Sequence, residues 1–129
     1  MNPTIKNYDM GGILLGENQF ETGTLTLATN GTVREGAFLA RNASTGKFTV
    51  VTETSGDDAQ TPVALYVGDD LTNDDTAKDF AIRALISGRV KAGACNVNGT
   101  AATDAELDMI RSYGIVPVRV TETNKLDNQ

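Results

Sequence analysis

Short stretches in which apolar and polar residues alternate recur along the chain, and they constrain its fold more than any other feature. In residues 22–28, Leu25 and Leu27 alternate with threonines, which is typical of a strand with one buried face. Asn30-Gly31 then predicts a tight turn. Polar or acidic turn segments separate the further predicted strands, which lie at 37–40, 47–52, 63–67, 80–90 and 115–120.

Two of these strands contain a residue that predicts a local feature of the sheet. Gly88 interrupts the alternation of the strand at 80–90, so we expect a bend or bulge there. Pro117 has no N–H group to donate within a sheet, which predicts that the last strand lies at an edge.

Only residues 103–113 have the pattern of a helix. Thr103 and Glu106 form a capping box, in which each side chain bonds the backbone N–H of the other residue. Gly114 is suited to the left-handed conformation that ends a helix. An apolar stripe at helical spacing lies between these signals and consists of Leu107, Ile110 and Tyr113.

The order of these elements predicts the fold class. About seven short strands with one helix do not alternate as βαβ units, so a doubly wound parallel sheet is disfavoured. We expect one mainly β domain, an antiparallel bent ribbon or incomplete barrel, over residues 22–120. Residues 1–21 are predicted to form a flexible N-terminal arm and residues 121–129 a polar tail.

The predicted arm has no sustained helical or strand period. It is interpreted either as a flexible segment or as a strand that pairs with an edge elsewhere, and its scattered apolar residues favour the second interpretation. The candidate anchors for such a contact are Ile5, Tyr8, Ile13, Leu14, Leu15 and Phe20.

Composition excludes several classes of partner. A net charge of −6 disfavours nucleic acid, because binding to phosphates depends on lysine and arginine displacing counterions. No apolar run approaches the roughly 20 residues of a membrane-spanning helix. The first residues lack the pattern of a secretory signal, and there is a single cysteine, so we expect a protein that remains in the cytoplasm in which it is made.

The residues that usually carry catalysis are scarce. The chain has no histidine, the commonest general base, and Cys95 lies among small residues with only Lys91 nearby to favour a thiolate. The acidic pairs Asp57-Asp58, Asp69-Asp70 and Asp74-Asp75 do not have the spacing of a calcium loop. We therefore expect no enzyme activity, no metal and no cofactor, and a packed thiol at Cys95.

An ordered set of motifs resembles a known family. They are Thr24–Leu27, 34–41, Thr45-Gly46-Lys47-Phe48, Pro62–Val67, Ile86–Val90 and Leu107–Val116. Together they resemble the lambda-type head decoration proteins of tailed bacteriophages, in which a T-G-K hairpin, a proline-led apolar strand, an S-G-x-V strand and a terminal helix ending in glycine and isoleucine recur in this order. The similarity spans residues 22–120, but the segments 69–79 and 96–102 do not align.

The resemblance implies a β-clip-like fold and a homotrimer on the outer surface of the expanded phage head. The implied partner is the major capsid protein, and the implied function is to stabilise the shell against internal DNA pressure. Other interpretations are another virion structural or adaptor β-module of a tail or spike, a small-ligand-binding β-domain, and a small enzyme that uses acids with arginine or lysine.

Overall fold

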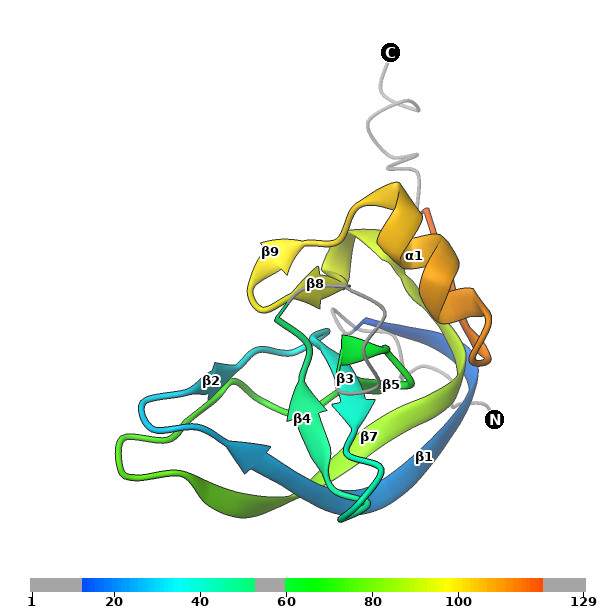
Figure 1. The fold of residues 1–129 in the computed structure, drawn as a ribbon. Helices are drawn as coiled ribbons and strands as arrows, with labels where there is room; N and C mark the ends of the chain where they lie inside the picture. Colours follow the sequence, from blue (N-terminus) through cyan, green and yellow to red (C-terminus); the bar gives the residue numbers. More distant parts are fainter. Residues whose placement is uncertain (1–12, 53–59, 120–129) are drawn as a thin grey trace, which may run out of the picture.

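The computed structural model describes residues 13–52 and 60–119, which are mainly β with one short helix (Figure 1). Its strands are β1 (Leu14–Leu27), β2 (Thr32–Val33), β3 (Phe38–Arg41), β4 (Phe48–Val50), β5 (Ala64–Tyr66), β6 (Leu71–Thr72), β7 (Lys78–Lys91), β8 (Asn96–Val97), β9 (Thr100–Ala101) and β10 (Ile115–Val118). A 3₁₀ turn at Ala92–Ala94 follows β7, and helix α1 (Asp104–Arg111) precedes β10.

The main sheet has the order β1-β4-β3-β5-β7-β10, and β1 pairs with β7 as well, so the sheet is partly closed. The pairs β1–β4 and β7–β10 are parallel, whereas the others in this sheet are antiparallel. The prediction of an antiparallel sheet is therefore wrong at these two pairs. For β10 the reason is α1, which acts as the crossover that returns the chain in the direction of β7.

Strands β1 and β7 form a ribbon that is longer than predicted, with 14 residues in each strand. Their pairing runs from Leu14 opposite Val90 to Leu27 opposite Lys78. Near one end, Glu17 and Asn18 of β1 oppose the single residue Gly88, whose φ is 133°. This bulge confirms the predicted irregularity at Gly88 and bends the ribbon.

The boundary predicted for the N-terminal arm is wrong. Residues 14–21 make up more than half of β1 and pair with β7, so they belong to the folded domain. The favoured interpretation, a strand that pairs with an edge, is thus confirmed for residues 14–21, although the bulge opposite Gly88 disturbs the two-residue period there. Residues 1–12 and the predicted tail at 121–129 lie outside the described residues.

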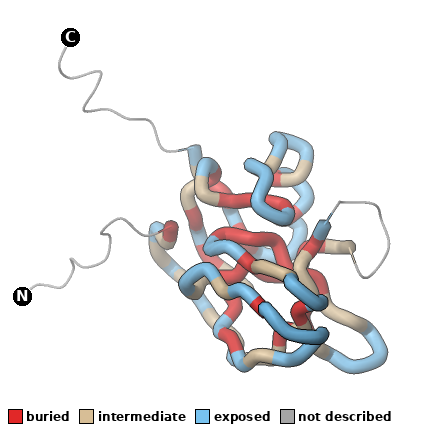
Figure 2. The backbone as a smooth tube through the Cα atoms, turned by 90° about the vertical axis from the view of Figure 1, so that its left-hand side faces the viewer, coloured by how far each residue is buried: buried red, intermediate tan, exposed pale blue. Residues whose placement is uncertain are grey.

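The buried side chains form two clusters, one on each face of the short central strands. Figure 2 shows where the buried positions lie along the backbone. Phe38 and Ala40 of β3 belong to the first cluster, whereas Leu39 belongs to the second. In the same way Leu65 of β5 belongs to the first cluster, between two residues of the second. Because both faces of these strands are covered, their sequences are continuously apolar instead of alternating.

Helix α1 begins as predicted. The Glu106 N–H donates to Thr103 Oγ1 at 3.2 Å, and the Thr103 N–H donates to Glu106 Oε1 at 2.8 Å, which confirms the capping box. Leu107 and Ile110 are buried in the first cluster, but Tyr113 is 44% exposed and lies beyond the helix. Its place in the predicted apolar stripe is therefore wrong, because the helix ends at Arg111.

Strand β10 lies at the edge of the sheet, as Pro117 predicted. The Pro117 carbonyl accepts a hydrogen bond from the Arg111 guanidinium at 3.1 Å. An edge residue without an N–H group, and with its carbonyl occupied, is a poor template for an added strand.

The bulge provides a stability prediction. Replacing Gly88 by alanine would place a Cβ 2.8 Å from the Asn18 Cα, at a φ of 133°. Gly16 has a similar φ of 139°, but a Cβ there would meet nothing within 4 Å. We expect Gly16→Ala to lower the free energy of unfolding by about 1 kcal/mol through backbone strain alone. Gly88→Ala should cost about 1–3 kcal/mol more, because overpacking is added to the same strain.

Urea denaturation of the two variants measures this difference. Equal losses would show that the contact between the bulge and Gly88 does not constrain the ribbon.

Candidate functional site

The structure does not gather the predicted arm residues on one surface. Ile5 and Tyr8 lie outside the described residues. Ile13 is 6% exposed and belongs to the first core cluster, and Leu14 packs against that cluster. These two side chains therefore contribute to folding and are not available as anchors.

The other two candidates differ from each other in exposure. Phe20 packs against the first cluster, and the Arg83 guanidinium lies 4.0 Å from the centre of its ring. Leu15 is 37% exposed. Of the four described candidates, Leu15 is thus the one that presents a large apolar surface to a partner.

Leu15 belongs to a mixed patch on the outer side of β1, β7 and β10. Arg89 of β7 is paired with Gly16 on one side and with Val116 on the other. Val116 is 39% exposed because Ile115 and Pro117, its neighbours in β10, point into the protein. Lys91 follows Arg89 on the same face. We refer to Leu15, Arg89, Lys91 and Val116 as the basic end.

The cations of the basic end differ from most others in the described part of the chain. Each described lysine or arginine outside β7 forms an ion pair, namely Arg34, Arg41, Lys47, Arg111 and Arg119. No ion pair within residues 13–52 and 60–119 involves the β7 cations Lys78, Arg83, Arg89 and Lys91. Lys78 and Arg83 lie over the rings of Phe80 and Phe20, whereas the side chains of Arg89 and Lys91 have no such contact.

The opposite end of β7 adjoins an acidic region. Strands β2 and β6 pair there, and the carboxylates around them are Glu35, Asp69, Asp70, Asp74 and Asp75, all exposed. We refer to these residues as the acidic tip. Burial raises the pKa of the Tyr66 hydroxyl, and Asp69, Asp70 and Glu35 raise it further, which indicates the negative potential at this end.

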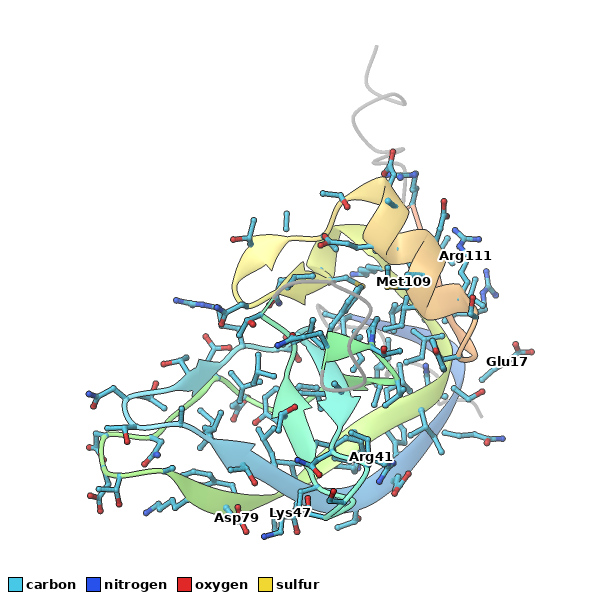
Figure 3. The ribbon with its side chains drawn as sticks, viewed as in Figure 1. Glu17, Arg41, Lys47, Asp79, Met109 and Arg111 are labelled. Atoms are coloured by element: carbon cyan, nitrogen blue, oxygen red, sulfur yellow. The ribbon has the colours of Figure 1, made fainter. Side chains whose placement is uncertain are left out.

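The ion pairs labelled in Figure 3 have a structural role. Arg41 of β3 reaches Glu21 of β1 at 3.1 Å. Lys47 reaches Asp79 of β7 at 2.6 Å, and this contact, with a hydrogen bond from Thr26, lowers the pKa of the Asp79 carboxyl. These pairs join segments that are distant in sequence.

A groove of about 390 Å³ opens where β1 and β4 diverge beyond the Leu25–Phe48 pair. Its walls include Thr26 and Leu27 of β1, and Thr49 and Val50 of β4. Its described lining contains no ionisable side chain and is mainly apolar. Such a lining suits an uncharged apolar group and offers no acid or base for a reaction.

Cys95 is buried, which confirms the predicted packed thiol. Burial raises its pKa to about 11, so the reactive thiolate is disfavoured at neutral pH. Among the residues with described positions, no three acids or cysteines are grouped as a metal site would require. In the same part of the chain, no helix is both long and apolar enough to span a membrane.

Comparison of the sequence with protein-family models gives no match, and comparison with curated proteins gives none either. The residues of the basic end were missed by sequence reasoning, apart from Leu15. The signal was present for Val116, which alternates with two apolar residues that face inward. It was absent for Arg89 and Lys91, because their lack of ion pairs depends on where the acids of other strands lie.

The burial of Cys95 leads to a chemical prediction. With a thiol pKa of about 11, native protein at pH 8 should react with Ellman's reagent far more slowly than the same protein unfolded in urea. Equal rates would mean that Cys95 is accessible and that the first core cluster is open beside it. The folded pKa lies above the ordinary value of 9.0, so the folded state also binds the proton more tightly. Its stability should therefore fall as the pH rises from about 9 to 11.

Replacement of Cys95 by alanine should remove that alkaline loss, which provides the matched control. Thermal unfolding at several pH values measures it.

Proposed function

We propose that this chain is a capsid decoration protein, which binds as a trimer to the outer surface of the expanded phage head and stabilises the shell. The observation that supports this most is where the family-like segments lie. The hairpin at 34–48, the strand at 62–67, the end of β7 and the segment from α1 to β10 all contribute to the first core cluster. Motifs that are separately weak thus belong to one packed unit.

The character of the described surface also supports the proposal. The part of the chain that the structure describes offers an uncharged groove, an inert thiol and a patch that combines exposed apolar and cationic side chains. A patch of that kind is typical of a protein interface, in which apolar contacts with arginine carry much of the affinity. A protein that stabilises a shell makes and breaks no covalent bond, so it needs only such surfaces.

Residues 1–12 join the domain beside this patch. The Lys91 N–H donates to the Ile13 carbonyl at 2.9 Å, which fixes the point where the N-terminal segment leaves the ribbon. In the proposed complex this segment orders on the major capsid protein and adds a strand to one of its exposed edges, with Ile5 and Tyr8 as anchors.

Trimer formation increases the strength of such an attachment. Once the first of the three N-terminal segments of a trimer has bound, the other two are held close to their binding sites at a high effective concentration. Weak single contacts therefore give a strong overall attachment. If the trimer binds the expanded shell and not its dissociated subunits, mass action stabilises the shell.

The groove between β1 and β4 favours one alternative, a small-ligand-binding β-domain. Its mainly apolar lining and volume of about 390 Å³ suit a small uncharged ligand. A ligand of this kind would shield Leu27 and Val50 from solvent. Removal of residues 1–12 would not change its binding.

Removal of residues 1–12 tests the decoration proposal. The truncation leaves Ile13 and the whole of β1 in place, so the domain should fold and remain a trimer. We expect it to lose attachment to expanded shells, measured by co-sedimentation. Removal of residues 120–129 is the matched control, because it deletes a similar length from the other end and should preserve attachment.

Full shell occupancy by the protein without residues 1–12 would contradict the role of this segment. Failure of both the complete chain and the truncated chains to bind any expanded shell would contradict the proposed function itself.

A further inference from the structure

A cyclic trimer imposes a condition on its subunits. Each copy must contact its two neighbours through two different patches, because a contact made by the same patch on both copies closes at a dimer. The chain must therefore carry a pair of complementary surfaces that do not contact each other within one copy. We propose that the basic end of one copy docks on the acidic tip of the next copy. This inference rests on the trimer of the proposed function and names its contact.

The basic end has the character of an interface. Arg89 and Lys91 are cations without an ion pair in the described chain, on a protein whose net charge is −6. Leu15 and Val116 lie on either side of Arg89 and are 37% and 39% exposed. Apolar side chains around an arginine give the affinity, and the cations select an acidic partner.

The acidic tip supplies that partner chemistry. It carries five carboxylates, and among the described residues one cation, Arg34, pairs with one of them, Asp70, at 3.5 Å. A copy of this chain therefore presents an excess of negative charge at the tip and, at the basic end, two cations that form no ion pair with a described carboxylate, Glu17 of β1 included. Complementary charges of this kind fix the orientation of two surfaces as they meet.

A buried asparagine holds the tip in one shape. Asn73 is 1% exposed, and its amide donates to the carbonyls of Ala28 and Thr76 at 3.0 and 2.9 Å. Its side-chain oxygen accepts from the Asp75 N–H at 3.1 Å. Asp74 and Asp75 are thus presented by a fixed loop, which lowers the entropy cost of binding.

The two patches cannot meet within one copy. The acidic tip adjoins Lys78 at the start of β7, and the basic end surrounds Arg89 and Lys91 at its other end. Strand β7 has 14 residues, and a strand rises about 3.3 Å per residue, so the ribbon holds the two patches apart. Figure 1 shows β7 running from the side of β2 to the region beneath α1. Each patch is therefore left for a neighbouring copy.

Charge reversal in the complete chain tests this contact. We expect native mass spectrometry and sedimentation to show that the wild type is a trimer. The double variant Arg89→Glu/Lys91→Glu places like charges against the acidic tip, which should raise the concentration needed for trimer formation by about a hundredfold. The matched control is Arg83→Glu, compared with Arg89→Glu alone, which makes the same change of charge on the same strand between the two patches and should remain a trimer.

A second variant separates the contact from a general effect of charge. Adding Asp74→Lys/Asp75→Lys to the double variant places two cations in the tip to face the two new carboxylates of the basic end, while Glu35, Asp69 and Asp70 stay unchanged. This fourfold variant should recover the trimer, and all of the variants should keep the circular dichroism of the wild type because the changed residues lie on the surface.

A trimer that is unaffected by Arg89→Glu/Lys91→Glu, or a loss that the fourfold variant does not restore, would overturn this contact. The proposed function would stand in that case if the trimer still attached to expanded shells. A wild-type monomer at all concentrations would overturn the contact and the trimer together. A trimer that forms only when nucleic acid is added would also overturn this contact, because nucleic acid and not the acidic tip would then be the partner of the basic end.

Discussion

The pairing of β1 with β7 along their whole length is the constraint on which the rest of the structure depends. One half of this ribbon supplies Leu25, Leu27 and Ile82 to the second core cluster, and the other half supplies Leu85 and Val90 to the first. Gly88 lies between Leu85 and Val90, where two residues of β1 oppose one of β7. Because the ribbon bends there, it encloses both faces of the short central strands, and this lets a small domain bury two cores.

The same ribbon positions the surfaces to which we assign a function. Its free cations gather at the end where residues 1–12 join the domain, and the acidic carboxylates gather at the other end. Patches held apart by a rigid strand pair suit contacts between copies and with a larger partner. In the proposed assembly the domain supplies the trimer contacts and the N-terminal segment supplies attachment to the shell. The stabilisation of the shell then follows from the sum of many binding events.

Local chemistry determined which features could be predicted from the sequence. The capping box of α1, the edge position of Pro117, the irregularity at Gly88 and the packed Cys95 each depend on a few neighbouring residues. The strand at 14–21 was favoured as one of two interpretations but was placed in an arm outside the domain, because the bulge disturbs its alternation. The parallel pairs were missed because pairing between distant strands leaves no local pattern. The basic end was missed for the same reason, since an unpaired arginine is recognised only when the positions of all nearby acids are known.

The central claim is that this protein occupies defined positions on a phage shell. The most direct measurement is image reconstruction of expanded heads that have been incubated with the purified protein. We predict three-fold density over the three-fold positions of the outer surface, with one domain of this shape in each third of it. Density confined to a tail or spike, or no added density on expanded heads, would contradict the account.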